Sequence, residues 1–167
     1  MMFQQDQNRF SPLVQEIAEF FDAIGVRILE GYGFSECTTA ATTNTHEQWR
    51  FGTVGEPFPG SEIRIAADGE IQVRGPGVMR GYHGMPDQTA AVLDADGWFS
   101  TGDVGEIDDG GRVRITDRKK DLVKTSGGKY IAPSVIEARL KASSPIVGHA
   151  VVHADKRNFA SALITLD

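Results

Sequence analysis

The sequence has few features that would suit an oxidising compartment or a membrane. Its 167 residues include one cysteine, Cys37, so the chain cannot form an internal disulfide. No run approaches the roughly 18 apolar residues of a membrane span. The N-terminal stretch MMFQQDQNRF also lacks the apolar core of a signal peptide. These absences predict a cytoplasmic protein without a transmembrane segment.

An excess of basic residues is also missing. The chain has 17 Lys and Arg against 23 Asp and Glu, a formal net charge of −6. Polyanions select basic surfaces, so nucleic acid is not expected as a partner. What is present is the composition of a folded globular protein, with 40% hydrophobic and 24% charged residues.

The first part of the chain has an α/β pattern. Residues 11–24, SPLVQEIAEFFDAI, are predicted to form a helix that Ser11 caps, Pro12 begins and Gly25 ends. Its apolar face carries Leu13, Ile17, Phe20, Phe21 and Ile24 at 3.6-residue spacing. Residues 26–29, VRIL, are predicted to be a short buried strand that leads into the loop EGYGFSE. In α/β sheets ligands gather where strands end in such loops.

From residue 52 the pattern becomes antiparallel β. The segments EIRIAADGEIQVRG and VGEIDDGGRVRI predict hairpins that turn at residues 68–69 and 108–111. A third hairpin is predicted to turn at residues 126–128. Pro133 then begins a predicted helix whose inner face carries Val135, Ile136 and Leu140. IVGHAVVHA and ASALITLD are predicted strands joined by the turn DKRN.

The expected fold class is therefore α/β, with a mixed α+β arrangement. A region of antiparallel hairpins would be followed by a separate small β–α–β–β unit; the family resemblance described below implies that these are the end of a larger domain and a partial C-terminal domain. The boundary is predicted near Asp117-Arg118, which divides the chain into residues 1–117 and 118–167.

The segment GYGFSE carries groups suited to a nucleotide. Gly31 and Gly33 allow close backbone approach, and Tyr32 offers an aromatic face. Ser35 offers a hydroxyl for a phosphate oxygen, and Glu36 offers a hard carboxylate for Mg²⁺. An ordinary turn with a core tyrosine explains this segment equally well.

Two later segments add polar groups. In WFSTGD, the Asp103 carboxylate can accept two hydrogen bonds from a vicinal diol such as that of ribose. The alternative is an Asx turn in which Asp103 bonds its own backbone. In RITDRKKDLVKTSGGKYIAP, Arg118 is suited to charge-assisted bonds with ribose or phosphate. The simpler interpretation of the lysines is a solvated face, and that of Gly127-Gly128 a hairpin turn; the lysines are Lys119, Lys120, Lys124 and Lys129.

In this order and spacing, the motifs resemble the adenylate-forming (AMP-binding) superfamily, and most of all its bacterial long-chain fatty acid–CoA ligases. The segments that carry the resemblance are EGYGFSE, GTVGEPFPG, GEIQVRGPGVMRGY, DGWFSTGD and ITDRKKDLVKTSGGKYIAP. The family activates a carboxylic acid with ATP and Mg²⁺ to an acyl-adenylate. It then passes the acyl group to a thiol, here expected to be that of coenzyme A.

The resemblance implies a role for each residue of GYGFSE that matches. Tyr32 would lie against the adenine, and Gly31 and Gly33 would let the nucleotide approach. Ser35 stands where the family usually has Thr and would bond phosphate. Glu36 would hold Mg²⁺ and serve as a catalytic residue.

The resemblance also assigns residues later in the chain. Asp103 and Arg118 would contact the ribose, and Ile115 would pack beside the nucleoside. Lys120 would be the hinge on which the small domain swings between an adenylating and a thioester-forming pose. The thiol step would involve a phosphate or coenzyme contact from Lys124 and a pantetheine tunnel lined by Gly127 and Gly128.

Parts of the family pattern are absent from the sequence. Residues 1–30 contain no Ser/Thr/Gly-rich phosphate loop ending in Lys, and QQDQNRF does not match the stretch that normally precedes the first helix. The catalytic lysine of the small domain is expected beyond Asp167, and most of the acyl tunnel upstream. We therefore expect a fragment that is inactive alone and is completed by an upstream polypeptide.

Other functions remain open at this stage. A non-catalytic remnant or interaction module would keep the fold without the reaction, and a carrier protein would replace coenzyme A as acceptor in a related ligase. A fatty acid substrate is also compatible with peripheral membrane contact, although no basic amphipathic helix supports it.

Overall fold

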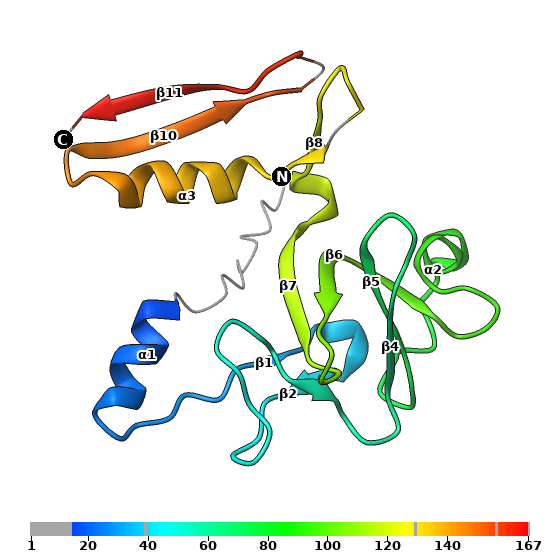
Figure 1. Cartoon of the computed structure of the whole chain (residues 1–167). Coiled ribbons are helices and arrows are strands. Elements are labelled where there is room, and N and C mark those ends of the chain that lie inside the picture. The colour runs from blue at the N-terminus through cyan, green and yellow to red at the C-terminus, as the bar shows by residue number, and fades with distance from the viewer. Residues whose placement is uncertain (1–14, 39, 129, 156, 167) are drawn as a thin grey trace.

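The computed structural model describes residues 15–38, 40–128, 130–155 and 157–166. The helices are α1 (Gln15–Ala23), α2 (Pro86–Val92) and α3 (Pro133–Ser143), with 3₁₀ turns η1 (Ser35–Cys37) and η2 (Lys119–Asp121). The strands are β1 (Gly31–Tyr32), β2 (Thr42–Thr43), β3 (Glu56–Pro57), β4 (Glu62–Ile65), β5 (Glu70–Arg74), β6 (Phe99–Ile107), β7 (Val113–Arg118), β8 (Val123–Lys124), β9 (Tyr130–Ile131), β10 (Val147–His153) and β11 (Ser161–Leu166). The predicted mixture of helices and antiparallel strands is confirmed (Figure 1).

A four-stranded antiparallel sheet, in the order β4-β5-β6-β7, is the frame of the first part of the chain. Both predicted hairpins lie in it: residues 68–69 connect β4 to β5, and residues 108–111 connect β6 to β7. Gly69 adopts a φ of +85°, a left-handed conformation that glycine reaches without a steric penalty. Ile71 and Val73 on β5 are fully buried, so this strand supplies the centre of the core.

A smaller sheet, β1-β2-β3, packs against this frame. Backbone hydrogen bonds from Val54 N to Val113 O, 2.8 Å, and from Val113 N to Gly55 O, 2.9 Å, join the two parts. The shared hydrophobic core consists of Tyr32, Cys37, Ala41, Val54, Ile71, Val73 and Val113. The GYGFSE segment is therefore packed directly against the main sheet.

The residues after η2 form a separate group of elements (Figure 1). Strands β8 and β9 pair as the predicted third hairpin, and β10 pairs antiparallel with β11. Helix α3 packs along β10, and Glu137 Oε1 accepts a hydrogen bond from Val152 N at 2.7 Å. Figure 1 shows α3, β10 and β11 on the opposite side of η2 from the main sheet.

The inner face of α3 differs from the prediction at one position. Ile136 and Leu140 are half-buried, as expected, but Val135 is exposed. Residues four apart share one side of a helix, whereas a neighbour in sequence is turned by about 100°. Val135 is therefore rotated out of the stripe that Ile136 and Leu140 share.

The predicted strand at residues 26–29 is wrong. The segment has no regular secondary structure and belongs to no sheet among the described residues, and Val26 is exposed. A β-strand exists through a ladder of hydrogen bonds to a neighbour, which apolar sequence alone cannot supply. The strand that does lead into the loop is the two-residue β1, held by its pairing with β2.

The predicted first helix is confirmed in its described part, Gln15–Ala23, and ends before Gly25, whose φ is +84°. Ser11, Pro12 and Leu13 lie outside the described residues. The predicted apolar face is largely exposed at Ile17, Phe20 and Ile24, whereas Ala18 is buried. Helix α2 was not predicted, although Pro86 in its first turn is a recognisable start signal.

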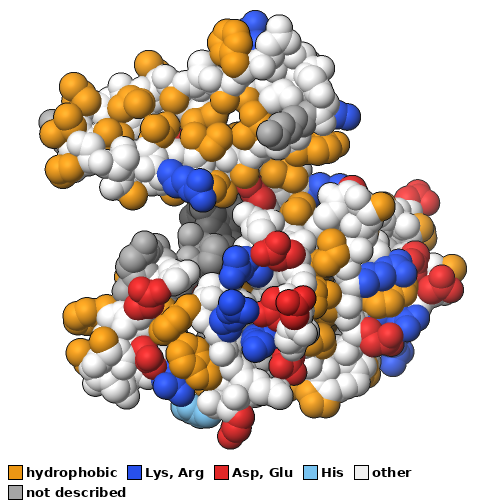
Figure 2. Space-filling view, viewed as in Figure 1, with side chains coloured by type: hydrophobic (Ala, Val, Ile, Leu, Met, Phe, Trp, Pro, Cys, Tyr) orange, Lys and Arg blue, Asp and Glu red, His pale blue; other side chains and the backbone are white. Residues whose placement is uncertain are grey.

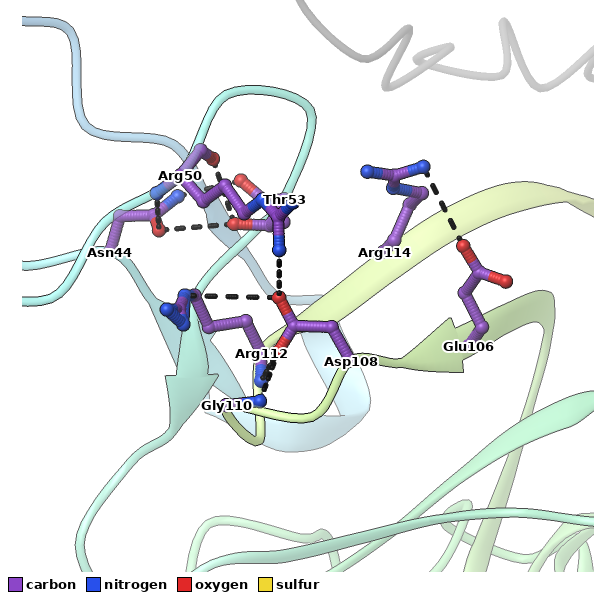
Figure 3. A network of polar contacts seen from close by, with 8 residues as sticks. All are labelled: Asn44, Arg50, Thr53, Glu106, Asp108, Gly110, Arg112 and Arg114. Carbon is purple, nitrogen blue, oxygen red and sulfur yellow. Dashed lines mark hydrogen bonds and ion pairs between the residues drawn. The ribbon is translucent and has the colours of Figure 1, made fainter.

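The loop between β2 and β3 is fastened to the β6–β7 turn (Figure 3). Asn44 Nδ2 donates to Thr53 O at 2.6 Å, and Arg50 Nη1 donates to Asp108 Oδ2 at 3.4 Å. Backbone N–H groups of Arg112 and Gly110 donate to the other oxygen of Asp108 at 3.0 and 2.9 Å. These bonds lower the pKa of Asp108 and keep its carboxylate charged. The network thus fixes one end of the frame.

The surface differs between the two parts of the chain (Figure 2). Hydrophobic side chains gather over the group that contains β10 and β11, where Val151, Leu163 and Leu166 are exposed. Acidic and basic side chains alternate over the first part. None of the helices in the described part of the chain is long and apolar enough to cross a membrane.

Candidate nucleotide site

Asp103 is carried by a bulge in the main sheet. Glu70 of β5 pairs with Val104 and Gln72 pairs with Ser100, so residues 101–103 of β6 lie opposite the single residue Ile71. Gly102 takes a φ of +75° within this bulge. Bulges redirect side chains out of the regular alternation of a strand and are common beside active sites.

The side chain of Thr101 fixes the bulge. Its Oγ1 donates to Ile71 O at 2.7 Å and accepts the backbone N–H of Asp103 at 3.1 Å. The Asx turn that was the alternative for Asp103 is therefore not observed, because its carboxylate bonds other side chains instead. The bulge leaves this carboxylate buried, with 6% of the residue exposed.

Two other segments of the chain reach that carboxylate. Tyr32 of β1 donates its hydroxyl to Asp103 Oδ2 at 2.5 Å. Arg118, opposite Asp103 in the β6–β7 register, donates from Nε to Oδ1 at 2.9 Å. Each carboxylate oxygen has two acceptor positions, so this arrangement can accept further hydrogen bonds from a ligand hydroxyl pair.

The surroundings keep Tyr32 neutral and Asp103 paired. Burial, followed by the nearby Asp103 charge, raises the pKa of the Tyr32 phenol well above its usual value. Tyr32 therefore remains a hydrogen-bond donor at physiological pH. It is 7% exposed and belongs to the core, so the core-tyrosine interpretation describes this structure, and adenine contact stays a prediction.

Neighbouring groups shape the surroundings of Tyr32. Gly31, Tyr32 and Gly33 line a concave pocket that also includes Ala40, Thr42, Thr43 and Phe58. Ile115, predicted to lie beside a nucleoside, is partly buried against the same core that contains Tyr32.

Glu36 lies in η1, and a loop from the β5–α2 connection crosses it. Tyr82 donates its hydroxyl to Glu36 Oε1 at 2.8 Å, and Met79 N donates to Glu36 O at 2.7 Å. Burial and this carboxylate raise the pKa of Tyr82, which stays a neutral donor. Ser35 begins η1 with an exposed side chain.

The donor set is compatible with magnesium bound through one protein carboxylate. Within the described ranges, no three His, Cys, Asp or Glu side chains cluster as a metal site would require. Mg²⁺ commonly uses one or two carboxylates and takes its other ligands from phosphates and water. Glu36, already oriented by Tyr82, fits that pattern.

The structure does not bring all predicted site residues together. Lys120 lies in η2 and Lys124 in β8, where its Nζ is 5.5 Å from the centre of the Tyr130 ring. Gly127 and Gly128 form an exposed turn, and a Cβ added to either would meet nothing within 4 Å. Their relation to a ligand stays a prediction.

Sequence reasoning missed the polar contacts of three residues around the site, Tyr82, Glu70 and Lys119. Tyr82 orients Glu36, as described above. Glu70 contacts both the Asp103 bulge and Lys119, at 2.8 Å in each case. Lys119 is exposed, as the solvated-face interpretation expects, but it also pairs with Asp68 Oδ2 at 2.7 Å, which that interpretation did not include. The signal that could have suggested this pairing is the opposite charge of the acidic residues at the start of β5 and the basic run that follows β7.

Comparison with known proteins identifies the family. A family model of AMP-binding enzymes matches residues 11–83. The chain is 43% identical over 157 residues to a putative fatty-acid–CoA ligase, fadD11, of Mycobacterium tuberculosis, covering 94% of this chain and 28% of that protein. It is 41% identical over 144 residues to long-chain-fatty-acid–CoA ligase 6 of Homo sapiens, covering 80% of this chain and 20% of that protein.

Solved structures agree with the sequence matches. ATP-bound MatB from Rhodopseudomonas palustris superposes with a TM-score of 0.78 at 36% identity, covering 94% of this chain and 34% of that one. The O-succinylbenzoate coenzyme A synthetase MenE of Bacillus subtilis, in complex with AMP, gives 0.77 at 31% identity over 94% and 35% of the two chains. The chain thus spans between a fifth and about a third of the proteins it matches, and it belongs to the AMP-binding, adenylate-forming superfamily.

Proposed function

We propose that the chain supplies part of an ATP-dependent long-chain fatty acid–CoA ligase. Such an enzyme activates a fatty acid to its acyl-adenylate and transfers the acyl group to coenzyme A. The observation that best supports this proposal is that Tyr32 and Arg118, which come from separate motifs, both bind the buried carboxylate of Asp103. The names of the relatives, fatty-acid–CoA ligases, support the choice of substrate.

In this proposal Asp103 accepts hydrogen bonds from the two ribose hydroxyls. Arg118 pairs with this carboxylate at 2.9 Å and itself contacts the ribose. Tyr32 holds the second carboxylate oxygen and offers its ring to the adenine, where Gly31 and Gly33 leave room for the base. The adjoining apolar contact comes from Ile115, which packs beside the nucleoside.

The phosphate end of the nucleotide lies toward η1 in this proposal. Ser35 bonds a phosphate oxygen through its exposed hydroxyl, and Glu36 ligates Mg²⁺, which would neutralise the charge that develops on the phosphates. The hydroxyl of Tyr82 holds Glu36 in place at 2.8 Å.

The second half of the proposal concerns the thiol step. Residues 1–117 and 118–167 act as two domains, and Lys120 in η2 is the hinge between them. Gly127 and Gly128 let a pantetheine arm pass close to the backbone, and Lys124 binds phosphate or coenzyme. The open space around both glycines is what such a passage needs.

We further infer that these residues alone bind nucleotide without completing the reaction. The M. tuberculosis relative is more than three times as long as this chain, since the 157 matched residues make up 28% of it. Adenylation depends on several groups held together around the reacting atoms. A complementing polypeptide would supply the groups that lie in the remainder of the relatives.

Titration with AMP, followed by NMR of the purified chain, tests the nucleotide site. AMP should shift the amide signals of residues 101–103, and Asp103→Asn should weaken binding by about tenfold, the loss of one charge-assisted hydrogen bond. Asp109→Asn is the matched control, because Asp109 is an exposed aspartate on the distant β6–β7 turn. Equal affinity in both variants would contradict the proposed site.

An ATP–pyrophosphate exchange assay with palmitate tests the inference about catalysis. Exchange above background by the purified chain would overturn it. A non-catalytic interaction module is the competing function, and it predicts neither exchange nor AMP binding. Restoration of exchange by adding the remaining part of a related ligase would favour the enzyme.

A further inference from the structure

The carboxylate of Glu70 connects two parts of the proposed site. Glu70 begins β5, and only 6% of it is exposed. Its Oε1 accepts the backbone N–H of Gly102 at 2.8 Å, and its Oε2 accepts Lys119 Nζ at 2.8 Å. A buried carboxylate is costly unless both oxygens are hydrogen-bonded, and here both are.

The first of these bonds holds the Asp103 bulge. Residues 101–103 have lost the regular β5–β6 pairing, so Gly102 N has no strand acceptor opposite it. The side chain of Glu70 supplies that acceptor, so it binds the residue directly before Asp103. A rotation of the Gly102 peptide would change the direction in which the Asp103 carboxylate points.

The second bond holds the end of β7. Lys119 directly follows Arg118, which pairs with Asp103, and directly precedes Lys120, the proposed hinge. Lys119 also pairs with Asp68 on the β4–β5 turn at 2.7 Å, so two carboxylates of the main sheet fasten it. A change of pose after Lys119 can therefore occur without pulling Arg118 from Asp103.

We propose that Glu70 is a positioning residue, which aligns Asp103 with Arg118 by binding the bulge and Lys119 with one carboxylate. It keeps the pair in register while the residues after Lys119 change pose. This inference rests on the proposed function, because it assumes that Asp103 binds the ribose diol.

The test compares AMP with 2′,3′-dideoxy-AMP by NMR titration of the full 167-residue chain. The native chain should prefer AMP by about tenfold, because Asp103 accepts the diol hydrogen bonds. Glu70→Gln keeps an oxygen for Gly102 N but removes the charge that faces Lys119. We expect the preference to fall to about twofold, whereas a purely structural role would leave it unchanged.

Matched variants separate alignment from folding. Asp68→Asn removes the exposed partner of Lys119 without touching Gly102 and should leave the preference within about twofold of the native value. Lys119→Met should reproduce the effect of Glu70→Gln, and the double variant should be no worse than either single one. Lys119→Arg should retain the preference, since it keeps the charge.

The outcomes also distinguish this inference from the proposed function. A native chain that does not prefer AMP contradicts the diol role of Asp103 and with it the proposed function. A native preference that survives in both Glu70→Gln and Lys119→Met contradicts the positioning role alone. If Glu70→Gln fails to fold, the AMP preference of Lys119→Met provides the test, because this variant breaks the same contact by removing the charge of Lys119.

Discussion

At the scale of single residues, the buried carboxylate of Asp103 determines what its neighbours must be. A desolvated carboxylate needs a donor for each oxygen, and Tyr32 and Arg118 supply one neutral and one charged donor. Loss of the Tyr32 hydroxyl would leave Asp103 Oδ2 without this donor, and because both residues are buried, this would be costly. Tyr32 thus serves the core with its ring and the site with its hydroxyl.

Tyr32→Phe should reveal both roles through the pH dependence of stability. At pH 7 we expect the free energy of unfolding to fall by about 1–3 kcal/mol, the effect of removing one partner from a buried polar group. Because the fold raises the pKa of Tyr32, keeping the phenol neutral stabilises the fold. This stabilisation is complete below about pH 10, the usual pKa of a tyrosine in an unfolded chain, and is lost as the pH rises above it.

Urea unfolding at pH 7 and at pH 11 measures this difference. The native chain should lose more stability between the two values than Tyr32→Phe, which has no phenol to ionise. Tyr130→Phe is the control, because Tyr130 is exposed and its substitution should change the free energy of unfolding at neither pH. Equal alkaline losses in the native chain and Tyr32→Phe would show that the buried phenol does not govern this dependence.

At the scale of elements, prediction worked where the signal was local. The hairpins at residues 68–69, 108–111 and 126–128 are encoded by a few adjacent residues with glycine, and all three are present. The strand expected at residues 26–29 depends on a distant partner, and it is absent from the described sheets.

The same distinction holds for the candidate site. Its residue types could be recognised from motifs, because the chemistry of a tyrosine, an aspartate and an arginine is visible in the sequence. The bulge that turns Asp103, the bond from Tyr82 to Glu36 and the attachment of Lys119 to Glu70 could not. Each joins residues that are between 32 and 49 positions apart, or depends on a register shift between strands.

The pairing of β2 with β3 depends on a close backbone approach at Gly55. Its φ is +86°, and a Cβ there would lie 1.9 Å from the carbonyl carbon of Thr43. Gly55→Ala should therefore lower the free energy of unfolding by about 3 kcal/mol or more, through both strain and overlap with backbone.

Gly25→Ala is the matched control for this prediction. Gly25 has nearly the same φ, +84°, but a Cβ there would meet nothing within 4 Å. It should cost only the backbone strain of about 1 kcal/mol. Chemical denaturation of both variants measures the difference, and equal losses would mean that the contact with Thr43 is relieved by a small movement.

At the scale of the whole molecule, the buried residues lie mostly in two groups, with Ala18 of α1 outside both. The hydrophobic core around Tyr32, Ile71 and Val113 draws its buried members from residues 32–113. After η2, Val152 and Ala154 are buried beside α3 and β10, and β11 is exposed along its whole length. This division agrees with the proposed hinge at Lys120, because a hinge requires that few core contacts cross it.

Hydrogen exchange should show that the two groups unfold independently. Val113 is fully buried, so Val113→Ala should destabilise the first group by about 2 kcal/mol and speed exchange in β5 and β6 by about 30-fold. Exchange in β10 should stay unchanged. Val152→Ala is the reciprocal variant, which should speed exchange in β10 and β11 but leave β5 and β6 as they are. If Val113→Ala speeds exchange equally in β10, the chain unfolds as one unit, and neither a domain boundary near Arg118 nor a hinge at Lys120 would be tenable.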